Sequence, residues 1–226
     1  MSFLLIDVAI LGGGFMLGRW LVRRSRARRM IGGGAGDSPA TRPRGAPALA
    51  PDPFGGLPFK LGDVLLRRGL GDEACDEAWL AGALVFSEER PVAALFIAPE
   101  AGGDRAIWVC HGVGEGAHRG SGFAVSWLTP LGKGGPPALA LAGEPPHSLE
   151  HDGVRFERAR RLPLTVTRHG SGAPAVGAQA VVAEYTGGGD QRLLVVAGET
   201  TLAFVGLALR DQDYEVLPGD ASTLER

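Results

Sequence analysis

Cysteine and histidine lie side by side at Cys110 and His111, with His118 a short distance further on, and these are the residues best suited to chemistry. A nucleophilic thiolate forms where a base takes the thiol proton, and imidazole can be that base, so the group would suit a thiol-dependent hydrolase. Successive side chains of a β-strand point to opposite faces, however. If residues 107–111 form a strand, Cys110 and His111 cannot hydrogen-bond directly, and Cys110 shares a core face with Trp108. The sequence therefore predicts no catalytic residue, and a hydrolase using Cys110 and a distant histidine remains an alternative.

The stretch from Gly112 to Gly122 is rich in glycine and suggests a phosphate-binding loop. A P-loop needs Gly-Lys-Ser/Thr at the start of a helix, and a dinucleotide fold needs GxGxxG between strand and helix. The letters GVGEGAHRGSGF contain neither pattern, and Glu115 would repel phosphate. The spacings of the five histidines match no known metal site: His111, His118, His147, His151 and His169. We expect no cofactor and no metal.

Charge is distributed unevenly along the chain. The formal net charge is −2, but six arginines lie between Arg19 and Arg29. Of the 23 basic and 25 acidic residues, 17 and 24 lie beyond residue 29, so that part carries a formal charge of −7. A nucleic-acid partner requires a basic face, so none is expected. Cys75 and Cys110, the only cysteines, show no spacing typical of a zinc site or disulfide framework.

The N-terminal segment reads as a membrane anchor. Phe3 to Val22 is apolar except for Asp7 and Arg19, and as a helix it would extend about 30 Å, the thickness of a bilayer core. Asp7 lies about one turn from the outer end, where its carboxylate can reach the interface. The sequence therefore predicts one single-pass transmembrane helix.

Arginines on one side of the segment predict its orientation. No Lys or Arg precedes the apolar run, and several follow it, so the positive-inside rule places the N-terminus outside and the rest in the cytoplasm. Arginine greatly outnumbers lysine, as in GC-rich bacterial genomes, so the membrane is expected to be a bacterial inner (cytoplasmic) membrane. The residues that mark the cytoplasmic boundary are Arg19, Trp20, Arg23 and Arg24.

One face of the anchor suggests a second role. Asp7, Leu11, Gly14 and Gly18 share a helix face, and Gly14 and Gly18 form a GxxxG pair. Such pairs allow two helices to approach closely. Self-association through Gly14 and Gly18, or contact with another membrane helix, is therefore a hypothesis.

Composition divides the chain into four parts. Residues 1–29 are the anchor and its basic flank, and residues 30–56 are a disordered linker rich in Gly, Ala and Pro. Residues 57–219 form a mainly β domain, as one unit or as two subdomains split near 131–146. Residues 220–226 form a tail.

Short apolar runs bounded by turns predict that this domain is all-β, either an antiparallel sandwich or a barrel. Asp152-Gly153 predicts a type I′ hairpin, and Gly71 to Leu80 is the only helix candidate. We expect strands over Lys60 to Arg67, Trp79 to Phe86, Val92 to Ala98, Arg105 to Cys110, Phe123 to Leu128, Leu162 to Thr167, Ala178 to Tyr185, Arg192 to Ala197, Thr201 to Ala208 and Tyr214 to Leu217.

Charged residues in these strands are expected to be structural. Alternation places Tyr185 with its hydroxyl at the surface and directs Glu184 outward. The basic group Arg158, Arg160 and Arg161 is interpreted as a solvated strand face that could touch anionic lipids.

The opening FKLGDVLLRRG, followed by LPLTVTRHG, VVAEYTGGGDQRLLVV, TTLAFVGLAL and YEVLPG, resembles the bacterial domain-of-unknown-function family 4178. The similarity covers most of Phe59 to Gly219. It implies a β domain and no established activity.

Architecture without a catalytic motif favours a membrane-anchored interaction or scaffold module over an enzyme. The β domain would bind a protein partner at the cytoplasmic face of the membrane. The alternatives are the thiol-dependent hydrolase using Cys110 and a small-ligand or lipid-binding domain with a cavity inside a barrel.

Overall fold

The structure is a computed structural model that describes residues 52–68, 76–100, 103–112, 122–132 and 144–219. All described residues belong to one compact unit, Ala50–Arg226. The predicted anchor and its residues therefore lie outside the described part: Asp7, Gly14, Gly18, Arg19, Trp20, Arg23 and Arg24. Within the described part, no helix has the length and apolar character needed to cross a membrane.

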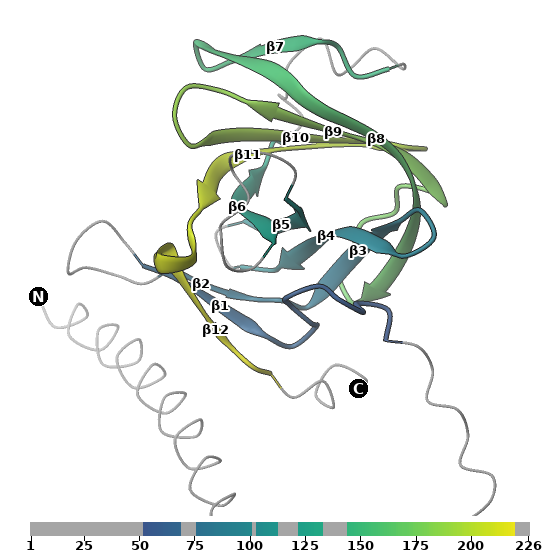
Figure 1. The fold of residues 1–226 in the computed structure, drawn as a ribbon, viewed down its shortest axis with the longest axis vertical. Helices are drawn as coiled ribbons and strands as arrows, with labels where there is room; N and C mark the ends of the chain where they lie inside the picture. The colour runs from purple at the N-terminus through teal and green to yellow at the C-terminus, as the bar shows by residue number, and fades with distance from the viewer. Residues whose placement is uncertain (1–51, 69–75, 101–102, 113–121, 133–143, 220–226) are drawn as a thin grey trace, which may run out of the picture. The chain divides into compact units, whose positions relative to one another are not determined.

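Eight antiparallel strands close into a barrel, in the order β3-β4-β5-β6-β11-β10-β9-β8, and β8 pairs back with β3 (Figure 1). This confirms the all-β prediction and makes the domain a barrel. Strands before and after residues 131–146 belong to it, because β6 pairs with β11. The barrel strands are β3 Gly82–Ser87, β4 Pro91–Ala98, β5 Arg105–His111, β6 Phe123–Pro130, β8 Val154–Gly170, β9 Gln179–Thr186, β10 Gln191–Ala197 and β11 Thr201–Leu209.

Two further pieces of β-structure cover parts of the barrel's outside. A three-stranded sheet in the order β12-β1-β2 packs below it, and β7 Ser148–His151 extends the main sheet above it (Figure 1). The small sheet consists of β1 Val64–Arg67, β2 Asp76–Trp79 and β12 Tyr214–Leu217, the last preceded by the 3-10 turn η2 Asp211–Asp213.

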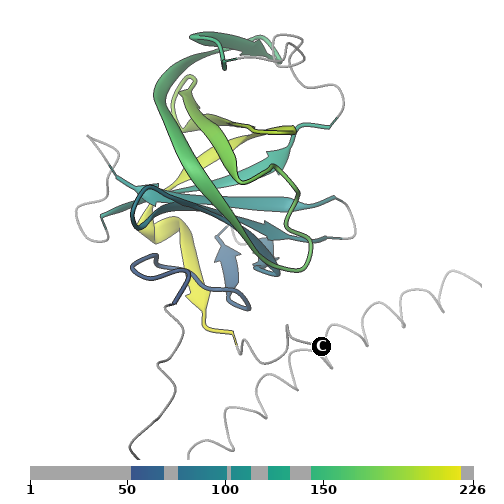
Figure 2. The same ribbon diagram turned by 90° about the vertical axis from the view of Figure 1, so that its right-hand side faces the viewer.

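The long strand β8 connects these layers. Its 17 residues pair with β7 at the start, with β9 in the middle and with β3 at the end. Figure 2 shows β8 running from the hairpin above the barrel down to the opposite end. One strand therefore both closes the barrel and covers part of its outer face.

A β-bulge in β8 makes this double use geometrically consistent. Between Arg158 and Arg160 the pairing with β9 shifts by one residue. Because of this extra residue, even-numbered side chains point to one face of the strand before the bulge and to the other face after it. Phe156, before the bulge, packs outside the barrel, whereas Leu164, after it, packs inside.

Apolar side chains form three clusters. The first fills the barrel interior, where Phe86 and Trp108 meet edge to face with ring centroids 5.5 Å apart. The second lies between the small sheet and the outer faces of β3 to β6, and the third lies beneath the β7–β8 hairpin. Phe54, within the segment predicted as linker, is buried in the second cluster and stacks on Phe96.

The sequence predicted most of these strands, with local differences. The type I′ hairpin is confirmed, because Asp152 and Gly153 have φ values of 50° and 73°. The helix predicted over Gly71 to Leu80 is wrong for residues 76–79, which form β2. These residues pair with β1 and bury only Ala78 against the barrel, which satisfies the alternating pattern of a strand.

Gly206 offers a test of barrel closure between β6 and β11. It lies opposite Leu128, and a Cβ at this position would collide with the carbonyl oxygen of Trp127. We expect Gly206→Ala to lower the free energy of unfolding by about 2 kcal/mol, because the two strands must separate. Urea denaturation followed by circular dichroism measures it. Gly188→Ala is the matched control, since nothing lies within 4 Å of a Cβ there. Equal losses in the two variants would contradict this account.

Candidate functional site

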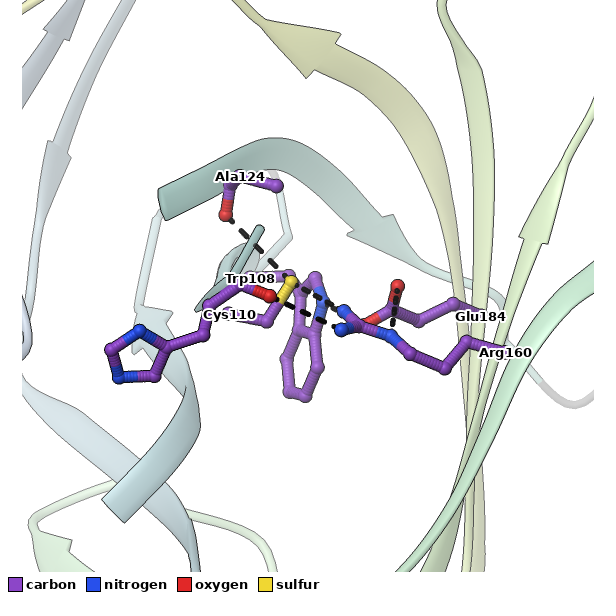
Figure 3. A network of polar contacts seen from close by, with 6 residues as sticks. Trp108, Cys110, Ala124, Arg160 and Glu184 are labelled. Carbon is purple, nitrogen blue, oxygen red and sulfur yellow. Dashed lines mark hydrogen bonds and ion pairs between the residues drawn. The ribbon is translucent and has the colours of Figure 1, made fainter. Parts of the chain in front are cut away.

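A polar network crosses one end of the barrel interior (Figure 3). Trp108 and Cys110 come from β5, Arg160 from β8 and Glu184 from β9. β5 is not a hydrogen-bonded neighbour of β8 or β9, so the contacts pass through the interior rather than along the wall. These four side chains are called the lumen cluster below.

The carboxylate of Glu184 is the centre of the lumen cluster. Arg160 donates to it twice, from Nη2 to Oε1 at 2.6 Å and from Nε to Oε2 at 3.2 Å. The indole Nε1 of Trp108 donates to Oε1 at 2.9 Å. The paired Arg160 and Glu184 side chains are 23% and 21% exposed, so this is a largely buried, two-point ion pair.

The remaining donors of Arg160 reach β5. Nη2 donates to the Cys110 Sγ at 2.8 Å, and Nη1 donates to the His111 carbonyl oxygen at 3.1 Å. The Cys110 thiol in turn lies 4.0 Å from the carbonyl oxygen of Ala124 on β6. Arg160 thus holds together strands on opposite sides of the barrel. In the described residues, no buried side-chain nitrogen or oxygen lacks a hydrogen-bond partner.

The β8 bulge explains why Arg160 points inward. Arg158, before the bulge, lies opposite Tyr185, whereas Arg160 lies opposite Glu184. The predicted orientations of Glu184 and Tyr185 were therefore wrong. Glu184 faces the interior on the same side of β9 as Val182, and Tyr185 is fully buried outside, beneath the β7–β8 hairpin. The Tyr185 hydroxyl donates to the Pro146 carbonyl oxygen at 2.7 Å, so it is not at the surface.

Arg158, Arg160 and Arg161 were predicted to form a solvated strand face, but Arg158 and Arg160 are largely buried. Arg161 pairs with Glu144 at 2.7 Å, and Arg158 approaches the same carboxylate at 3.5 Å. Arg158 is only 12% exposed and also donates to the Pro145 carbonyl oxygen. Two of the three arginines thus tie the hairpin to the segment before it, and the third is inside the barrel. Of the three arginines, only Arg161 is exposed, and its charge is paired with Glu144.

Electrostatics in the lumen cluster disfavour a reactive thiol. Burial, followed by the negative charge of Glu184, raises the pKa of the Cys110 thiol to about 12, and Arg160 only partly offsets this. Burial opposes the charge of Arg160, but its hydrogen bonds to Glu184 and the charge of that carboxylate raise its pKa. Cys110 is 2% exposed. The network therefore holds a neutral thiol beside a charged pair.

The predicted separation of Cys110 and His111 is confirmed. Cys110 shares the interior with Trp108, whereas the exposed His111 packs its ring against Phe123 at 4.6 Å between centroids. Cys75 and His118 lie outside the described residues. In the described part of the chain, no group of three or more His, Cys, Asp or Glu residues is arranged to hold a metal ion.

A groove of about 340 Å³ is lined by residues 163–165 of β8 and by parts of β9 and the β3–β4 turn. Its lining includes Glu88, Pro163, Thr165 and Gln179, and Glu88 is its only charged residue. It contains no member of the lumen cluster. The groove therefore combines one carboxylate with small polar and apolar side chains, and its lining contains no histidine or cysteine.

No family model, curated protein or solved structure matches this chain.

Removing Glu184 tests the lumen cluster. Glu184→Ala leaves the Arg160 charge and the Trp108 N–H without their partner, so we expect the free energy of unfolding to fall by about 3 kcal/mol. The double variant Arg160→Met/Glu184→Leu replaces both charges by apolar groups and should lose less than Glu184→Ala alone. Urea denaturation of the full chain measures both. A double variant that loses as much stability as Glu184→Ala, or more, would contradict this account of the ion pair.

Cys110 also predicts a pH dependence of stability. In the unfolded chain the thiol loses its proton near its ordinary pKa of 9.0, whereas the folded state keeps it up to about 12. The free energy of unfolding should therefore fall as pH rises above 9, because the unfolded state alone gains by ionising. Cys110→Ala removes this contribution, so its stability should decline less steeply than that of the wild type. Parallel curves up to about pH 11 would contradict it. The raised pKa values of Tyr185 and Tyr214 affect both proteins equally.

Proposed function

We propose that this chain is a membrane-anchored protein-interaction module, with its N-terminal helix in a bacterial inner membrane and its barrel in the cytoplasm. The observation that carries the proposal is the filled interior of the barrel. Because side chains occupy that interior, recognition falls to the outer surface. The anchor and its orientation enter the proposal from the sequence pattern alone.

Packing of the interior supports this reading. Ligand-binding barrels enclose an open cavity, whereas an eight-stranded barrel can also be just wide enough for its own side chains. Here apolar residues from all eight strands line the interior, among them Phe86, Trp108 and Phe204. The lumen cluster at one end bonds to itself and leaves no donor pair directed at a ligand. A lipid or small molecule would have to displace these contacts.

The outer surface offers strands with a free edge. Within the described sheets, β2 and β12 are the edges of the small sheet, and β7 is an edge of the large one. Edge strands present backbone groups and side chains to which another protein can add a strand or dock. A barrel of this kind can therefore act as a rigid support for recognition surfaces.

The hydrolase alternative receives less support. It needs a thiolate at Cys110 and a base within reach, but burial keeps the thiol protonated and His111 points away from it. A ligand-binding alternative would use the outer groove, where Glu88 supplies the only charge. The Cys110 site therefore lacks the thiolate and the nearby base that a hydrolase needs, and the groove has a single charged side chain with which to hold a ligand.

Cross-linked affinity purification of the full chain from membranes tests the proposal. We expect a protein partner in near-stoichiometric amounts, and we expect Cys110→Ala/His111→Ala to recover it equally well, because neither residue belongs to the edge strands β2, β7 and β12. The destabilised variant Glu184→Ala is the control for loss of fold. Recovery of no specific partner would overturn the proposal. Loss of the partner in a folded Cys110→Ala/His111→Ala variant would instead favour a role for Cys110 or His111, and Cys110→Ala alone would distinguish the two.

A further inference from the structure

The small sheet has an outer face that is more apolar than a solvated sheet face should be. Strand pairing sets Val64 of β1 directly opposite both Trp79 of β2 and Leu217 of β12. Residues directly opposite in a sheet point to the same face, so these three side chains form a row across the three strands. Trp79 is 42% exposed, and Val64 and Leu217 are partly exposed.

A second row follows two residues further along each strand. Leu66 of β1 lies opposite Glu77 of β2 and Glu215 of β12. Both glutamates are exposed, and neither has an ion pair or side-chain hydrogen bond with another described residue. The outer face therefore carries an apolar row and, beside it, two carboxylates flanking Leu66.

The opposite face of the same sheet provides its packing against the barrel. Leu65 and Ala78 point toward the barrel and are fully buried in the second apolar cluster. The sheet therefore packs on the barrel with one face, and no apolar cluster of described residues includes the side chains of the other. An apolar row on such a face marks an interaction surface more often than a scattered exposed side chain does.

The β7–β8 hairpin, the other layer on the barrel, provides an internal comparison. Its inner face carries Leu149 and Phe156, which are buried. On its outer face Glu150 lies opposite Arg155, and Arg155 pairs with Glu157. That outer face carries charged and polar side chains and no large apolar one, as expected for contact with water. The small sheet differs in carrying a row of apolar side chains.

We propose that the outer face of the small sheet binds a basic amphipathic helix of a partner protein. This inference rests on the proposed interaction function and specifies the chemistry of its partner. The apolar row accepts the apolar stripe of the helix, and Glu77 and Glu215 pair with Lys or Arg beside that stripe. The acidic body of the chain beyond residue 29 favours a basic partner in the same way. An anionic membrane surface is disfavoured, because both glutamates would face lipid phosphates.

Dimensions support a helix that crosses the three strands. Neighbouring strands lie about 4.8 Å apart, so the row from Trp79 to Leu217 spans roughly 10 Å. Positions i and i+7 of a helix are separated by about 10.5 Å along its axis. Apolar residues at i, i+3 or i+4, and i+7 would therefore meet one strand each. Glu77 and Glu215 have the same separation and suit two cations about seven residues apart.

The test uses a synthetic helix of about 18 residues, with leucines at this spacing and arginines beside them. Its fluorescence anisotropy is measured against the full chain in phosphatidylcholine nanodiscs. We expect Glu77→Lys/Glu215→Lys to weaken binding about tenfold or more through charge repulsion, and Trp79→Ala to weaken it about tenfold through loss of the apolar anchor. The charge-reversed chain should in turn bind a version of the peptide with glutamates in place of arginines.

The matched control is Glu89→Lys/Glu150→Lys, which changes the net charge equally at exposed residues away from the small sheet. Peptide binding by this control should remain close to that of the wild type. Equal weakening by both charge reversals would overturn the inference, as would unchanged binding in folded Trp79→Ala and Glu77→Lys/Glu215→Lys chains. Absence of peptide binding by the wild type would overturn it as well.

The same variants separate this inference from the broader proposal. If cross-linking in membranes recovers a partner from the wild type and equally from Glu77→Lys/Glu215→Lys, the interaction function stands and the assignment of this face fails. If the wild type recovers no partner, the interaction function itself fails. Circular dichroism and thermal melts of each variant confirm that the barrel remains folded in both experiments.

Discussion

The bulge in β8 is the constraint on which the rest of this domain depends. Without the extra residue between Arg158 and Arg160, a strand that buries Phe156 outside the barrel would direct Leu164 outside as well. The shift lets one strand belong to the outer hairpin at its start and to the barrel wall at its end. Closure with β3, cover for β9 and the inward position of Arg160 all follow from it.

An ion pair inside the barrel needs a reason, because desolvating two charges is costly. In this barrel the cost is reduced by hydrogen bonds from Trp108 to Glu184 and from Arg160 to the backbone of His111. Apolar side chains of similar size could fill the same space in several rotamers. The directional bonds instead fix the relative positions of β5, β8 and β9 at this end. The cluster is thus better explained as a set of contacts that stabilises the barrel than as a reaction centre.

Sequence pattern predicted the strands well, because alternation and turn residues are local signals. Asp152-Gly153 and the run at Tyr214 to Leu217 are clear examples, and both are found as expected. The lumen cluster was not predicted, for two physical reasons. Both faces of β9 are buried, so alternation around Glu184 could not distinguish inside from outside. The bulge changes the face to which Arg160 points, and the alternation of residue types does not reveal it. Barrel closure, which pairs β3 with β8, depends on contacts between residues far apart in sequence.

Layering accounts for where an interaction surface can arise in such a domain. A barrel with a filled interior has only its outside for recognition, and each layer that covers an apolar part of the outside creates a new outer face. On the β7–β8 hairpin that face carries charged side chains, namely Glu150, Arg155 and Glu157. On the small sheet the corresponding face keeps Trp79, so the layer that completes one core leaves another apolar face uncovered. Covering it from another protein would repeat, between chains, the packing by which this barrel is built.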